Sequence, residues 1–122
     1  MINNREEQKE ALETLEEFNE RLVKNMKIIV KELTGQRLDD TDAFLDGIVK
    51  ALNWEIQVVN GTMELLNEGK TRLDKEEFNA QIMNLSAAIE AKNDADLAKA
   101  FQMMIPEFEK LGVAAEEVTV QD

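Results

Sequence analysis

Apolar residues recur every three or four positions up to residue 33, a spacing that places them on one face of an α-helix. Charged side chains fill most positions between them, as expected for a face turned to solvent. Thr34 and Gly35 follow directly, and a glycine at this point is a common helix stop. The pattern predicts a first helix with the apolar face Leu12, Leu15, Phe18, Leu22, Met26, Ile29 and Leu33.

Three further segments repeat this period. The second helix begins after four candidate N-caps at residues 39–42 and stops near Gly69. Asp74 starts the third with Glu77 three residues later, a capping-box pattern, and Asn93 caps the fourth. The predicted apolar faces are Leu45, Ile48, Leu52, Ile56, Val59, Met63 and Leu66, then Phe78, Ile82, Leu85 and Ile89, then Leu97, Phe101, Met104, Phe108 and Leu111.

The fourth helix contains Pro106, which cannot donate a backbone hydrogen bond. The apolar stripe keeps its phase on both sides of Pro106, so a kink is expected there rather than a break. Little pattern remains after Gly112, and residues 113–122 are expected to fray. The first two helices then run about 28 residues, or about 42 Å, and the last two about 18, or about 27 Å.

Four amphipathic helices joined by short connections predict an all-α, four-helix up-and-down antiparallel bundle with a long first hairpin. Residues 1–122 contain 43% apolar residues, enough for the core of one domain. β-branched residues do not alternate with polar ones over the length of a strand. No stretch of 18 uncharged apolar residues is present, so no membrane span is expected.

The second helix carries a second apolar stripe beside the first, and the two together cover roughly 220° of its circumference. Two interpretations remain open. The helix lies centrally and contacts three neighbours, or the second stripe receives another helix. The predicted partner-binding residues, which combine this stripe with two neighbouring positions, are Phe44, Gly47, Ile48, Ala51, Trp54, Glu55, Val58, Gly61 and Leu65.

Helix lengths favour the second interpretation. The shorter pair would leave roughly 10–15 Å of the first hairpin uncovered. Apolar side chains at that end, including Met26 and Phe44, would then need a cover from a second copy, a partner or the C-terminal segment. A symmetric homodimer is the simplest cover, because twofold self-association is the commonest closed assembly.

Glu55 falls inside the apolar arc of the second helix. A carboxylate there must pair with a cation, bind water or lie at the edge of an interface. Arg21 and Arg72 are the candidate cations. An ion pair is favoured over catalysis, since no catalytic companion of Glu55 is visible.

The charge balance limits the partners. With 26 acidic and 14 basic residues the net charge is −12, which repels nucleic acid and anionic membrane surfaces but suits a basic protein. Cysteine is absent and the N-terminus is charged rather than apolar, so the protein is expected in the cytoplasm.

The sequence lacks most of the parts that catalysis uses. Histidine and cysteine are absent, which removes the usual bases, nucleophiles and zinc ligands, and no phosphate-binding glycine loop occurs. We expect no catalytic residue, no metal and no cofactor, and the chain is not expected to be an enzyme.

Two segments carry a resemblance to known bundles. Residues 42–50 (DAFLDGIVK) resemble the start of a core helix in flagellar-export chaperones of the FliS and FliT kind. The stretch from Phe101 to Leu111, with IPEF at 105–108, is similar to the last helix of small acidic bundles from Gram-positive bacteria. The resemblance implies a small helical bundle that binds an amphipathic segment of a client.

Three functional hypotheses follow. The first is a non-catalytic, chaperone-like protein-binding bundle that forms a homodimer or takes up an amphipathic helix of a client protein. The second is a carboxylate-dependent metal enzyme that uses Glu55 and neighbouring acids. The third is an acidic decoy for a nucleic-acid-binding protein.

Overall fold

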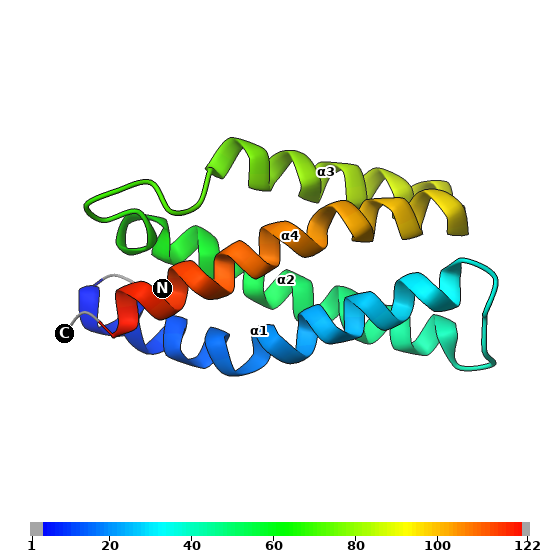
Figure 1. The fold of residues 1–122 in the computed structure, drawn as a ribbon, viewed down its shortest axis with the longest axis horizontal. Helices are drawn as coiled ribbons and strands as arrows, with labels where there is room; N and C mark the ends of the chain where they lie inside the picture. The colour runs from blue at the N-terminus through cyan, green and yellow to red at the C-terminus, as the bar shows by residue number, and fades with distance from the viewer. Residues whose placement is uncertain (1–3, 121–122) are drawn as a thin grey trace.

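The computed structural model describes residues 4–120 and consists of four helices: α1 (Arg5–Leu33), α2 (Thr41–Leu66), α3 (Lys75–Ala91) and α4 (Asp94–Thr119). Successive helices run in opposite directions (Figure 1). The predicted all-α, up-and-down antiparallel bundle with a long first hairpin is therefore confirmed. Within the described range no helix has both the length and the apolar character needed to cross a bilayer.

The four helices are not equally spaced. α1 lies along both α2 and α4, α3 packs on α4, and α2 meets α4 across the bundle (Figure 1). Between residues 4 and 120, no Cα atom of α2 comes within 8 Å of one in α3. α2 therefore has two close helical neighbours, α1 and α4, and not the three that a central position would give it.

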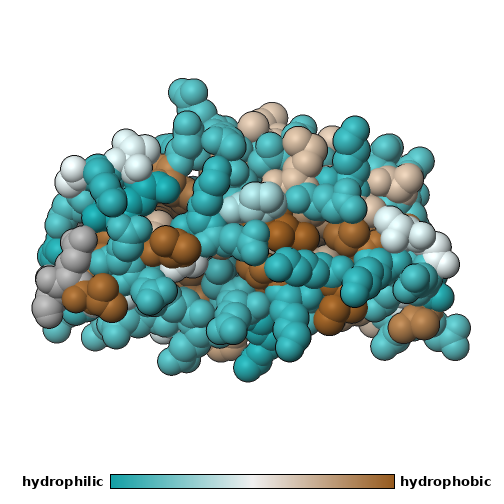
Figure 2. Space-filling model, viewed as in Figure 1, coloured by the Kyte–Doolittle hydropathy of each residue, from teal (hydrophilic) through white to brown (hydrophobic). Residues whose placement is uncertain are grey.

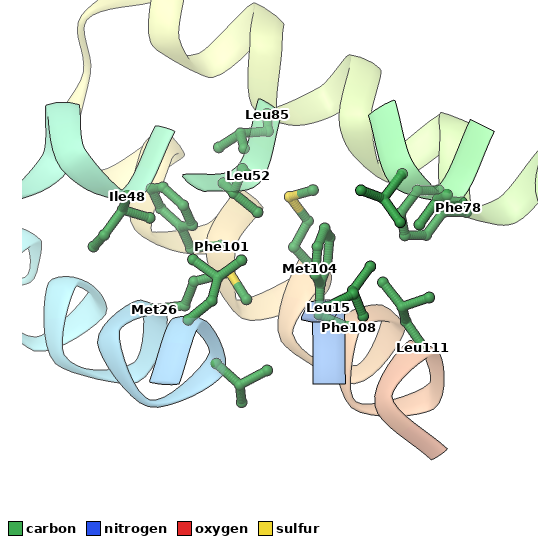
Figure 3. Close-up of a cluster of buried hydrophobic side chains, with 14 of the residues drawn as sticks. Leu15, Met26, Ile48, Leu52, Phe78, Leu85, Phe101, Met104, Phe108 and Leu111 are labelled. Carbon is green, nitrogen blue, oxygen red and sulfur yellow. The ribbon is translucent and has the colours of Figure 1, made fainter. Parts of the chain in front are cut away.

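The core is built by side chains from all four helices, as the close-up in Figure 3 shows. The rings of Phe78 in α3 and Phe108 in α4 are in contact, with centroids 5.3 Å apart. Leu15 from α1 and Leu52 from α2 are buried in the same cluster. The face seen in Figure 2 is mainly hydrophilic, with apolar side chains visible between the polar ones along its middle.

Two of the predicted helix starts are confirmed by their caps. The Asp74 carboxylate accepts a hydrogen bond from the backbone N–H of Glu77 at 3.0 Å. The Asn93 side chain accepts one from the N–H of Asp96 at 3.1 Å. Each bond satisfies a donor that the first turn of a helix leaves free, which fixes where α3 and α4 begin.

α2 begins differently. Its N-cap, Asp40, makes no side-chain capping bond. The buried hydroxyl of Thr41 instead accepts a hydrogen bond from the backbone N–H of Leu38 at 2.8 Å and donates one to Glu32 at 2.7 Å. These bonds tie the loop before α2 back to the end of α1.

α4 is longer than the sequence predicted. It passes through Pro106 as one continuous helix of 26 residues. Ala114, Ala115 and Val118 are buried in the core. The expectation that the chain frays from residue 113 is thus wrong for residues 113–119, while residues 121 and 122 lie outside the described part.

α4 extends along the whole first hairpin. At the loop end of the hairpin, the Arg37 guanidinium donates to the carboxylate of Asp94, the first residue of α4, at 2.8 Å. At the opposite end, the Thr119 hydroxyl donates to Glu16 at 2.8 Å. Met26 is fully buried. The predicted bare stretch of 10–15 Å is therefore wrong, because residues 67–74 lead α3 to a start part-way along the bundle, which places the turn from α3 into α4 at the loop end of the hairpin (Figure 1).

Candidate partner-binding groove

A groove of about 720 Å³ lies between α1 and α2. All of its lining residues belong to this helical pair, so α3 and α4 leave this side of the hairpin open. They are Phe18, Arg21, Leu22 and Asn25 from α1, and Ala43, Phe44, Gly47, Ile48, Ala51, Trp54 and Glu55 from α2.

Small side chains form the α2 wall of the groove. Ala43, Gly47 and Ala51 follow one another at intervals of four residues, which places them in one row. A Cβ atom added at Gly47 would meet no other heavy atom within 4 Å, so the protein's own side chains do not fill this space. From Ala43 to Trp54 the wall extends about 16 Å, or three helical turns.

An aromatic pair with a neighbouring arginine borders the groove. The rings of Phe18 and Trp54 meet edge to face, with centroids 5.8 Å apart and an interplanar angle of 76°. Both rings remain accessible, with 46% of Phe18 and 40% of Trp54 exposed. The Arg21 guanidinium lies over the Phe18 ring, 6.0 Å from its centroid. Tryptophan and arginine, with tyrosine, are the residues that most often dominate the binding energy of protein interfaces.

Glu55 is the one acidic residue of the groove, and it is almost completely buried, with 1% exposed. Neither carboxyl oxygen has a hydrogen-bond partner in the described structure. Burial disfavours the charged form and raises the pKa of Glu55 to about 8. At neutral pH the side chain is therefore mostly protonated and uncharged.

The ion pair expected for Glu55 is not formed. Arg21 lies over Phe18 instead. The Arg72 guanidinium donates to the backbone carbonyl of Leu66 at 3.1 Å, near the loop that follows α2. Both candidate cations are thus engaged elsewhere, and the carboxyl group is left without a charged neighbour of its own chain.

Six of the nine predicted partner-binding residues line the groove, namely Phe44, Gly47, Ile48, Ala51, Trp54 and Glu55. The other three do not. Val58 and Leu65 are buried in the core, and Gly61 lies outside the lining. A stripe with an average spacing of 3.5 residues turns by about 20° per heptad around a straight helix, so its far end leaves the groove and enters the core.

The α1 wall of the groove was not predicted. Phe18 was assigned to the buried face of the first helix, yet nearly half of it is exposed. On a helical projection Phe18 lies about 60° from the centre of that face. Asn19, on the other edge, is buried and donates to the backbone carbonyl of Phe108 at 2.9 Å. The position of Phe18 at the edge of the apolar face was therefore the sequence signal that it could be exposed.

A cluster of two acidic residues and a lysine joins α3 to α4. Glu107 is buried, and its pKa is raised first by burial and then by the nearby carboxylate of Glu77. The Lys110 ammonium lies 3.5 Å from Glu107 and 3.8 Å from Glu77. Among residues 4–120 no three acidic side chains converge on a point that could hold a metal ion.

The family described as a domain of unknown function, DUF8042, matches residues 10–113, which is most of the chain. The chain belongs to the DUF8042 family. The DUF8042 match includes every residue that lines the groove and ends one turn or more before the end of α4. No curated protein and no solved structure matches the chain.

Proposed function

We propose that this chain is a non-catalytic helical bundle that binds an amphipathic helix of another protein in the groove between α1 and α2. The observation that supports the proposal most is the open apolar groove with Trp54 and Phe18 at its border. An accessible apolar surface with aromatic residues is typical of an interaction site.

The shape of the groove favours a helix as the occupant. Its three-turn length suits the apolar face of a helix whose large side chains recur at i, i+4 and i+7. Gly47 and Ala51 let the backbone of an incoming helix approach α2 closely. Phe44 and Trp54 then flank the approach from either end of the row.

Charge favours a basic partner over a second copy. The chain carries a net charge of −12, so two copies repel one another, whereas a basic helix is attracted. The argument for a homodimer depended on a bare hairpin end, and α4 covers that end. We therefore assign the groove to a helix with an apolar face and basic residues on its other side.

Trp54 is the only tryptophan of the chain, so its fluorescence reports directly on the groove. The probe is a helical peptide of about 18 residues with leucine at i, i+3, i+4 and i+7 and lysine elsewhere. We expect its binding to shift the Trp54 emission to shorter wavelength, because the ring leaves water.

The substitution that tests the site is Ala51→Asp, with Ala87→Asp as its matched control on the exposed surface of α3. Ala51→Asp is expected to weaken peptide binding at least about tenfold, since it places a charge in an apolar contact. Ala87→Asp should leave binding unchanged. Sedimentation should show a monomer. Failure to bind the peptide, or a dimer that Ala51→Asp dissociates, would contradict the proposed occupant.

A further inference from the structure

Glu55 is a buried acid at the groove without a partner in its own chain. Its two carboxyl oxygens are covered and accept no hydrogen bond in the described structure. A buried polar group without a partner lowers the stability of a fold, and such groups are uncommon in native proteins. A glutamate at the border of a binding groove therefore calls for a partner from outside the chain.

The other charged and polar groups nearby do not supply that partner. Arg21 is the charged side chain that α1 contributes to the lining, and its guanidinium lies over Phe18. α3 and α4 contribute no lining residue. The buried acid of α4, Glu107, is close to Lys110 and belongs to the separate cluster with Glu77.

We infer that the helix bound in the groove carries one lysine or arginine within its apolar face, and that this side chain pairs with the carboxylate that Glu55 forms when it releases its proton on binding. The inference rests on the proposed function, because it names the chemistry of the same occupant. Hydrogen bonds between a cation and a carboxylate are stronger than neutral ones, and more so where water is excluded.

The lining around Glu55 suits such a side chain. The long aliphatic stem of lysine or arginine can lie along Ala51 and Ile48 while its charged end reaches the carboxyl group. The neighbouring Trp54 ring is partly accessible, and an aromatic ring attracts a nearby cation. Because the Glu55 carboxyl oxygens are covered in the free chain, the Glu55 side chain has to turn toward the groove to make this contact.

Position along the groove adds a constraint. Glu55 lies eight residues after Gly47 on α2, or about 12 Å along the helix axis. The cation of the occupant should therefore lie near one end of its apolar face, about two turns from the apolar side chain that packs over Gly47. A cation at the centre of the apolar face would face the small residues of the α2 wall.

A double-mutant cycle tests the pairing. The peptides are the all-leucine-faced probe and versions with one terminal leucine of the apolar face changed to lysine. The proteins are the wild type and Glu55→Leu, with Glu64→Leu as a control on the exposed side of α2. Glu55→Gln, which keeps the shape of the side chain, guards against a folding defect.

We expect Glu55→Leu to weaken binding of one lysine-bearing peptide at least about tenfold relative to the all-leucine peptide, and Glu64→Leu to weaken neither. Glu55→Gln should lose most of the preference for the lysine-bearing peptide over the all-leucine peptide. If the effects of the peptide change and the protein change on the binding free energy simply add, the inference is overturned. The proposed function still stands in that case, provided that the all-leucine peptide binds and that Ala51→Asp weakens its binding.

Two other outcomes also have a definite meaning. The first concerns Arg21→Met. If this substitution abolishes the effect of Glu55→Leu on the affinity for both peptides alike, Arg21 is the partner of Glu55 and the inference is overturned. Failure of every peptide to bind the wild type would contradict the proposed function and this inference together.

Discussion

At the scale of single residues, Glu55 makes stability depend on pH. Its pKa is about 8 in the folded chain, against an ordinary value of 4.5. Between these values the folded chain holds a proton that the unfolded chain releases. The contribution of Glu55 to stability therefore falls as pH rises from about 4.5 to about 8 and is level above that.

Glu55→Gln removes this titration. The variant should unfold at nearly the same denaturant concentration as the wild type at about pH 5, and should be more stable by several kcal/mol, with about 5 kcal/mol as the upper limit, at about pH 9. Urea unfolding at both pH values measures the difference. If the difference in unfolding free energy between the two proteins is the same at every pH, Glu55 is not buried in its uncharged form.

Asn19 and Gly112 form a second residue-scale constraint. A Cβ atom at position 112 would lie 2.8 Å from the Asn19 side-chain nitrogen, which donates to the carbonyl of Phe108. Gly112→Ala should therefore cost about 1 kcal/mol, because disruption of a buried hydrogen bond outweighs the better helix propensity of alanine.

The test of this contact is its reversal. In an Asn19→Ala background the clash is absent, so Gly112→Ala should stabilise the protein by up to about 1 kcal/mol. Thermal unfolding of the four proteins gives the comparison. The same sign in both backgrounds would mean that Asn19 does not restrict position 112.

At the scale of elements, packing of α4 against the hairpin of α1 and α2 determines how much of that hairpin is exposed. Its last two turns bury Val118 but leave Val113 58% exposed. Val118→Asp should destabilise the protein by about 3 kcal/mol or more, since it buries a charge. Val113→Asp, its matched control, should change stability by less than about 1 kcal/mol. A small effect of Val118→Asp in urea unfolding would mean that the end of α4 is not packed.

The sequence predicts the elements better than their surroundings. Caps such as Asp74 and Asn93 are local, and a local pattern is sufficient to place them. The end of α4 was missed because Ala114 and Ala115 are small and do not mark an apolar stripe. The α1 wall of the groove, which contains Phe18, was missed for a different reason. Which edge of a helix is covered depends on the tertiary placement of its neighbours, and periodicity does not contain that information.

At the scale of the whole molecule, charge and shape act together. The net charge of −12 attracts a basic helix over distance, and the apolar groove holds it on contact. Binding of the lysine-rich probe should therefore weaken several-fold as salt rises from about 50 to about 500 mM. A version with glutamine in place of lysine on the polar side should show little salt dependence. Equal salt dependence of both peptides in a fluorescence titration would contradict the electrostatic contribution.

Amide chemical shifts test the central claim most directly. Isotope-labelled protein is titrated with the basic peptide, and the shifts of all backbone amides are followed. We predict that the largest changes fall on residues 18–25 of α1 and 43–55 of α2, while the protein remains a monomer. Changes centred on α3 and α4, or spread evenly over all four helices, would contradict the assignment of the groove as the binding site.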